Sequence, residues 1–214
     1  MLDVSSDTFD QHGDLRLVVG EEKAVSLVCS RALARASPTF FNTLLYGNFA
    51  EAKGRQNGDW RIDLPEDDPH ALCLLLNIIH GRFERVPDQL SEDHLYRVIV
   101  LTDKYGLAHI LRPWVRSWLN LSPKNTDSAV HMAWIAWELG DHGLFSRACT
   151  YLLNHSHVGP AGDLTDANGF LLDSLDVTAH MDIDGTLRLA DHATSSRDCL
   201  ALLVKANLSA RRST

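Results

Sequence analysis

Apolar and polar residues alternate in two short runs near the N-terminus, at residues 14–19 and 24–28. A period of two places alternate side chains on the same face of a strand, and these runs flank a short turn that contains glycine. We therefore predict a β-hairpin. A third alternating run, residues 60–64, follows a polar loop at 51–59 and predicts a strand that joins the same sheet. Residues 1–12 are polar and are predicted to be flexible.

Elsewhere the apolar residues recur at helical spacing, and several of the expected helices carry end signals. A helix is predicted over 29–37, and Pro38 is predicted to open the next one, because proline suits the first helical position. Asp68 and Ser91 are predicted to cap two later helices, since their side chains can accept hydrogen bonds from free N–H groups. The apolar residues expected in the core from the second helix are Phe40, Phe41, Leu44 and Leu45.

The strongest amphipathic stripe covers residues 107–119, where Pro113 must lie in the first turn or kink the helix. Residues 121–157 then predict a helical hairpin that extends the main domain, with Gly140 between its helices. Residues 158–214 read as a linker followed by a weakly patterned helical segment. Tryptophans at helical spacing could form an aromatic ligand site, but we interpret them as packing residues. They are Trp114, Trp118, Trp134 and Trp137.

Composition and charge narrow the class of protein. The chain has 214 residues, 45% hydrophobic and 22% charged, with a net charge of -8 and a pI near 5.7. An acidic balance argues against nucleic-acid binding, which needs a basic face to neutralise phosphates. No apolar run approaches the ~20 residues of a membrane span, and the N-terminus does not resemble a signal peptide. The four cysteines show no metal-like spacing, so we expect an intracellular protein, cytoplasmic or nuclear or both.

Three Asp-His pairs invite a catalytic interpretation, because a carboxylate can orient a histidine that acts as a base. They are Asp93-His94, Asp141-His142 and Asp191-His192. Adjacency in sequence does not supply that geometry, and no known catalytic motif accompanies the pairs. His155 and His157 also lack the spacing of metal ligands on a helix. We therefore expect no enzymatic activity, no catalytic residue, no metal and no cofactor. A small helical enzyme with an unrecognised Asp/His site remains an alternative hypothesis.

The order of the predicted elements and several segments resemble the BTB/POZ domain over residues 13–120. The segments are GDLRLVVG, VCSRALARASPTFFNTLLYGNFAEA, IDLPEDDPHALCLLLNIIHG and LYRVIVLTDKYGLAHILRPWVRSWL. Within them, LPEDDP, IIHG, DKYG and PWVRSWL are similar to BTB proteins of filamentous fungi. The resemblance implies an α+β fold, with a small mixed β-sheet flanked by helical hairpins and followed by an α-helical C-terminal extension.

The resemblance also implies that the chain works by binding other proteins. BTB adaptors of cullin-type ubiquitin ligases carry a hydrophobic residue, any residue and a glutamate after the second helix, which Phe49, Ala50 and Glu51 match. A cullin scaffold is therefore one expected partner. The predicted partner-binding residues are Tyr46, Asn48, Phe49 and Glu51.

Self-association is the second interaction role that the resemblance leaves open. Asp14 matches an aspartate of the family's dimer contact, and Arg31 lies one position beyond the place of its basic partner. These two residues are the predicted dimer contacts, in a transcriptional or scaffolding regulator without its own DNA-binding domain. In either role the expected partners are proteins, with no nucleic acid, no membrane and no small-molecule substrate.

Overall fold

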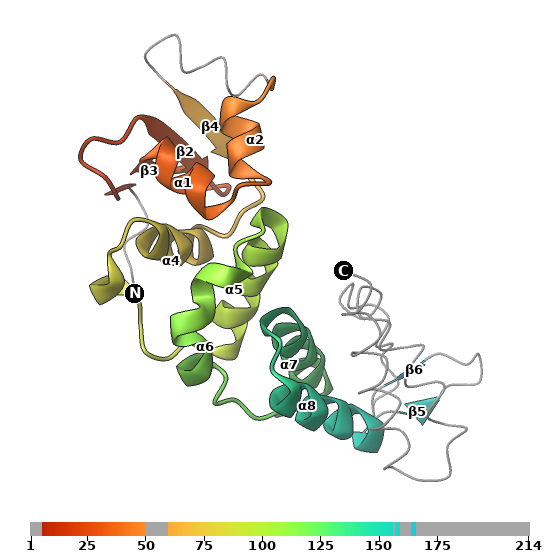
Figure 1. Cartoon of the computed structure of the whole chain (residues 1–214). Coiled ribbons are helices and arrows are strands. Elements are labelled where there is room, and N and C mark those ends of the chain that lie inside the picture. The colour runs from red at the N-terminus through yellow and green to blue at the C-terminus, as the bar shows by residue number, and fades with distance from the viewer. Residues whose placement is uncertain (1–5, 50–59, 156, 159–163, 166–214) are drawn as a thin grey trace. The chain divides into compact units, whose positions relative to one another are not determined.

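The computed structural model describes residues 6–49, 60–155, 157–158 and 164–165, and the chain divides after Trp118 into two units. The first unit combines a small mixed sheet with helices, so the protein belongs to the α+β class, as the family resemblance implies. The second unit contains a helical hairpin and a short two-stranded ladder. Figure 1 shows the elements of each unit.

The sheet of the first unit has four strands in the order β1-β3-β2-β4. Its strands are β1 (Ser6–Thr8), β2 (Leu15–Val19), β3 (Ala24–Val28) and β4 (Arg61–Leu64). Strands β2 and β3 form the predicted antiparallel hairpin, and β4 joins β2 in parallel, as the alternating run at 60–64 predicts. Gly20 turns the chain after β2 with a φ of +70°, and an added Cβ would lie 2.7 Å from Pro69 Cγ. Only glycine fits this turn without strain.

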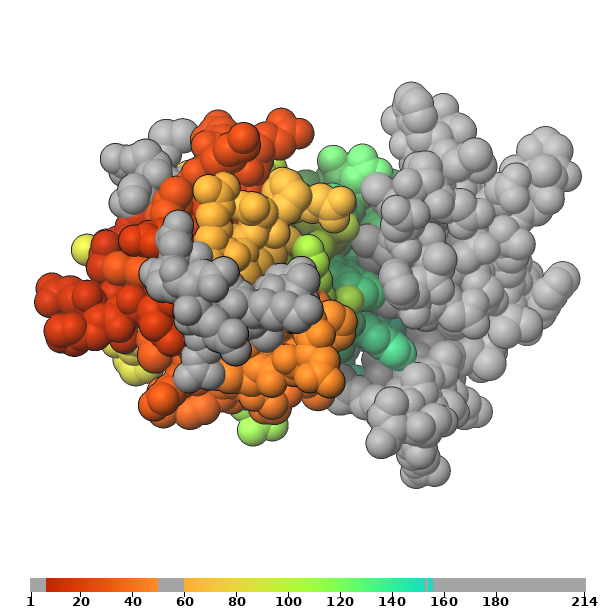
Figure 2. Space-filling model, turned by 90° about the horizontal axis from the view of Figure 1, so that it is seen from above, coloured from red at the N-terminus to blue at the C-terminus, as the bar shows by residue number. Residues whose placement is uncertain are grey.

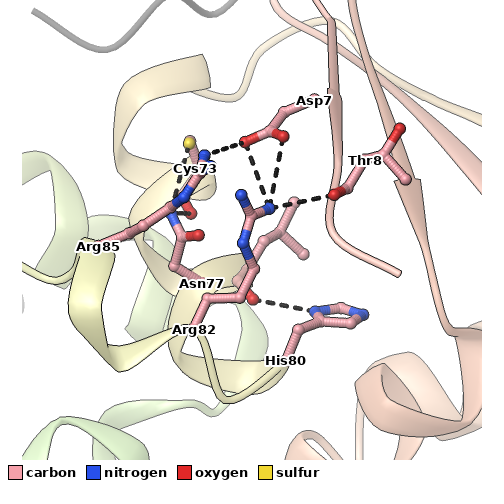
Figure 3. A network of polar contacts seen from close by, with 8 residues as sticks. Asp7, Thr8, Cys73, Asn77, His80, Arg82 and Arg85 are labelled. Carbon is pink, nitrogen blue, oxygen red and sulfur yellow. Dashed lines mark hydrogen bonds and ion pairs between the residues drawn. The ribbon is translucent and has the colours of Figure 1, made fainter. Parts of the chain in front are cut away.

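Strand β1 is the main difference from the sequence prediction, which left residues 1–12 without regular structure. Ser6–Thr8 pairs in parallel with β3, and the next residue, Phe9, is buried. Side chains from beyond α4 hold the strand: Arg82 Nη1 lies 3.4 Å from the Asp7 carboxylate and 3.2 Å from the Thr8 carbonyl oxygen. Figure 3 shows Asp7 between Arg82 and Arg85. A three-residue polar strand has no alternating pattern, so its sequence gives no strand signal.

Helices cover the sheet and build the core of the first unit. They are α1 (Ser30–Ala36), α2 (Phe41–Tyr46), α4 (Pro69–Ile79), η2 (Phe83–Arg85), α5 (Glu92–Tyr105), η3 (Ala108–Leu111) and α6 (Arg112–Trp118). Helix α4 lies between α1 and α5, and residues 71–78 are all buried (Figure 1). The predicted caps are confirmed: Asp68 accepts from the Ala71 N–H at 2.8 Å, and Ser91 accepts from the His94 N–H at 3.3 Å.

Helix α2 begins three residues later than predicted, because Pro38 lies in a turn and the helix starts at Phe41. The predicted core of this helix is confirmed for Phe41 and Leu45, which are 1% exposed. Phe40 and Leu44 are only half-buried, so the prediction is wrong for them. The late start of α2 explains the exposure of Phe40 and Leu44, because a helix of six residues turns only Phe41 and Leu45 fully toward the core.

In the second unit, α7 (Thr126–Leu139) and α8 (His142–His155) form the hairpin that the helical spacing predicts. Gly140 ends α7 with a φ of +71°, and the ring centroids of Trp137 and Phe145 lie 5.9 Å apart. Strand β5 (His157–Val158) begins at the last residue of the segment predicted to be a helical hairpin, and it pairs with β6 (Leu164–Thr165) in the region predicted to be a linker. The weakly patterned C-terminal segment lies outside the described residues.

Candidate protein-interaction site

The C-terminal end of α2 exposes an aromatic side chain in the segment predicted to bind a partner. Phe49 is 52% exposed, and Asn48 before it is also exposed. Figure 2 shows that α2 and β4 form part of one outer face of the first unit. Large aromatic residues in contact with solvent are typical anchors of protein interfaces. Glu51 and Ala50 lie outside the described residues, so the rest of the predicted motif stays a prediction.

Gly47 allows the chain to leave α2 in the direction that exposes Phe49. Its N–H donates to the Thr43 carbonyl oxygen at 2.9 Å, and a Cβ at this position would lie 2.3 Å from the same oxygen. Any larger residue would therefore break the end of the helix. The Phe49 ring passes beside Gly47, with Cδ2 3.6 Å from the place of that Cβ. Gly47 therefore determines the direction in which the backbone leaves α2 toward Phe49.

Tyr46 and Asp14, predicted for two different contacts, belong to one hydrogen-bonded group. The Asp14 carboxylate accepts from the Ser30 N–H at 2.8 Å and from the Ser30 hydroxyl at 2.7 Å. The same hydroxyl lies 2.6 Å from the Tyr46 hydroxyl. The Tyr46 ring meets Trp60 edge-on, with centroids 6.1 Å apart. The group therefore ties the start of β2 to the start of α1 and to the last residue of α2.

Arg31 follows Ser30 on α1 and is exposed. It has no ion-pair partner among the residues that the structure describes. The two predicted dimer contacts therefore differ in their surroundings. Asp14 accepts hydrogen bonds from Ser30, whereas the neighbouring Arg31 is exposed to solvent. The sequence identifies both residues, and it does not identify Ser30 as the group that links Asp14 to Tyr46.

His80 is a further linking residue that the sequence does not reveal. Its Nε2 accepts a hydrogen bond from the Cys29 N–H at 3.0 Å, across 51 residues. Its Nδ1 lies 2.9 Å from the Leu76 carbonyl oxygen, which can only accept, so the proton sits on Nδ1. The ring is therefore neutral in this arrangement. Burial lowers the pKa of His80 and Arg82 adds to this, while the Leu76 hydrogen bond and Asp10 oppose it.

Acidification should therefore weaken the first unit through His80. The pKa of His80 is lower in the folded than in the unfolded state, so the unfolded chain takes up a proton first as the pH falls. The contribution of neutral His80 to the unfolding free energy is therefore complete above about pH 6.5 and is lost as the pH falls further. One such group contributes a slope of at most about 1.4 kcal/mol per pH unit. We expect His80→Gln to reduce the fall in unfolding free energy between about pH 7.5 and about pH 5, measured by urea denaturation. The exposed His109→Gln is the control, and an equal effect of both variants would contradict the assignment.

The predicted Asp-His pairs that the structure describes do not form carboxylate-imidazole contacts. Asp93 binds Arg97, with Oδ2 3.0 Å from Nη2, and Asp141 accepts from the Leu144 N–H at 2.7 Å. The third pair, at 191–192, lies outside the described residues. No group of three or more metal-ligating side chains occurs in the described part of the chain, where Cys29, Cys73 and Cys149 are free thiols.

Within the described ranges, no helix is both long enough and apolar enough to span a bilayer. No model of a known protein family matches the chain, and no curated protein matches it significantly.

Proposed function

We propose that this chain is a non-enzymatic protein-interaction module of the BTB/POZ type, acting inside the cell as an adaptor for a cullin-type ubiquitin ligase. Support comes from the sheet and the helix order: β2 lies between β3 and β4, and helices follow each of the strands β3 and β4. This arrangement agrees with the resemblance of residues 13–120 to that family.

The observation that carries the proposal is the exposure of Phe49 just after α2, a helix whose own aromatic residues pack inward. Phe41 is buried, and Tyr46 is half-buried against Trp60 and Ser30. Burial of a solvent-exposed phenylalanine by a partner contributes to binding roughly in proportion to the apolar area removed from water. Tyr46 and Asn48 precede Phe49 in the chain, and Glu51 would add a charged contact.

Self-association is a second role, and exposed Arg31 supports it. In a dimer of the family type, a basic group of the second copy would pair with the Asp14 carboxylate. Here that carboxylate already accepts two hydrogen bonds from Ser30 of the same chain. We therefore favour the adaptor role. Light scattering over a range of protein concentrations separates the two, because a self-associating regulator shows a mass of two or more chains.

We expect Phe49→Ala combined with Glu51→Arg to reduce capture of the scaffold partner by about tenfold or more, because hot-spot residues contribute over about 1 kcal/mol each. The measurement is affinity capture of the tagged full chain from its native cell, followed by mass spectrometry. Phe49 is exposed, so the loss of its ring should leave the fold intact, which circular dichroism checks for the double variant.

Phe83→Ala is the matched control, because Phe83 is 58% exposed but follows α4 rather than α2. It should leave capture of the same partner unchanged. Recovery of that partner at the original level by the Phe49/Glu51 variant would refute the assignment of this surface. Absence of any cullin together with self-association would instead establish the regulator role.

A further inference from the structure

A pocket of about 560 Å³ lies in the first unit, apart from the surface around Phe49. Three segments line it: the start of α4, residues 84–91, and the first two turns of α5. Its volume is within the range of small-molecule sites, roughly 300 to 1,000 Å³. No feature of the proposed adaptor role uses this pocket.

The lining of the pocket is mainly apolar, and its walls are fixed by internal bonds. Val86 is buried in it, with Pro87 and Leu90 beside it. The Pro87 carbonyl oxygen accepts a hydrogen bond from Trp118 Nε1 at 2.9 Å, and Ser91 caps α5 directly after Leu90. These bonds hold the segment in place without a ligand, so the pocket is formed in advance.

The charges around the pocket favour a cation. Arg97 is held by two carboxylates, at 2.9 Å from Asp68 and 3.0 Å from Asp93. Arg85 is directed to Asp7, outside the lining, at 3.4 Å (Figure 3). The third carboxylate of the lining, Glu84, is exposed and has no ion-pair partner among the described residues. It is therefore available to a ligand's positive charge.

An anionic ligand is disfavoured at the same place. The partial positive charge at the N-terminus of α5 could attract an anion, but Glu92 and Asp93 occupy the first turn, and Ser91 already accepts from a free N–H group. The two arginines of the lining are compensated by aspartates. His70 and His94 are the other basic side chains of the lining, and an added carboxylate would meet the negative charges of Glu84 and Asp93.

We infer that this pocket binds a small organic cation with an apolar body, such as a protonated aryl-alkyl amine. The apolar body contacts Val86, Pro87 and Leu90, and the ammonium group pairs with Glu84. The site is a binding site for an effector ligand, since the lining shows no arrangement of groups for bond-making chemistry.

The test is a titration of the ¹⁵N-labelled full chain with phenethylamine, followed by two-dimensional NMR. Phenethylamine is a cation at neutral pH, and phenylacetate provides nearly the same shape with a negative charge. We expect saturable shifts of the Leu90 and Ser91 amides with phenethylamine, at a dissociation constant of about 1 mM for so small a probe. Phenylacetate should bind at least about threefold more weakly.

Two variants assign the contacts. Glu84→Gln should remove the preference for the cation, and Leu90→Gln should weaken both probes, while Glu22→Gln in the exposed β2-β3 turn should change neither. Glu84 is exposed, so its variant should fold, and the spectrum itself reports folding. The inference is overturned by equal binding of the two probes, or by shifts that avoid Leu90 and Ser91.

This test does not depend on the proposed adaptor role, because it uses only the full chain and a probe. Failure of probe binding leaves the Phe49/Glu51 capture experiment unaffected. Loss of captured proteins from Glu84→Gln, without any probe binding, would also overturn the inference and would assign the pocket to a peptide segment instead.

Discussion

Replacing Phe41 by alanine should lower the free energy of unfolding by about 4 kcal/mol, because it removes a fully buried aromatic ring and leaves a cavity. Phe41 is 1% exposed and stacks on Tyr105, with ring centroids 4.7 Å apart. Its N–H also donates to the Ser37 hydroxyl, which in turn donates to the Tyr105 carbonyl oxygen. The ring therefore joins α2 to the end of α5. Urea denaturation followed by circular dichroism measures the loss.

Phe40→Ala is the matched control, because it removes the same side chain at the neighbouring position. Phe40 is half-buried, and its ring contacts Phe41 and Tyr105 edge-on. We expect a loss of only about 1 to 2 kcal/mol, in proportion to the smaller apolar area that it buries. Equal losses for the two variants would show that the structure assigns the wrong phenylalanine to the core.

The second large effect is expected for Asp67→Ala, at about 3 kcal/mol of unfolding free energy. Asp67 is 3% exposed and accepts hydrogen bonds from the Tyr105 hydroxyl and from Lys104 Nζ, the latter at 2.6 Å. Burial raises the pKa of Tyr105 and Asp67 raises it further, so this hydroxyl stays protonated and donates. Without Asp67 the buried hydroxyl has lost its acceptor, and Lys104 its counter-charge.

An exposed aspartate provides the comparison. Asp63 pairs with Arg61 at 2.8 Å, but both side chains are more than half exposed. Asp63→Ala should therefore change the unfolding free energy by less than about 0.5 kcal/mol, because surface ion pairs contribute little. Raising the salt concentration should weaken the ion pair of Asp63 with Arg61 further. It should leave the loss of unfolding free energy caused by Asp67→Ala nearly unchanged. A small effect of Asp67→Ala would contradict the buried network.

Much of the fold can be predicted from the sequence because its signals are local. Asp68 followed by Pro69 marks the start of α4, and the alternating runs mark β2, β3 and β4. Strand β1 has no such signal, because its place depends on the edge of β3 and on Arg82, far along the chain. The late start of α2 is not predicted either, because Pro38 lies in a turn and the helix begins only at Phe41, whose ring stacks on Tyr105.

Some residues of the candidate sites can likewise be predicted from the sequence, whereas the contacts between them cannot. Phe49 can be identified from a short pattern after α2, and Asp14 and Tyr46 from the family resemblance. Their connection through Ser30 requires the approach of β2, α1 and α2, which no spacing in the sequence encodes. The pocket beside Glu84 is still less visible, since segments around residues 68, 86 and 94 form it only after α4 and α5 have packed together.

Strand β1 also has a consequence for aggregation. Without it, β3 would be the outer strand of the sheet, and its unpaired N–H and C=O groups could recruit a strand from another molecule. The three residues of β1 occupy that edge, and Arg82 and Arg85 hold Asp7 there by ion pairs. The short strand covers residues 25–27 of β3, and its own outer edge offers only three residues for pairing with another chain.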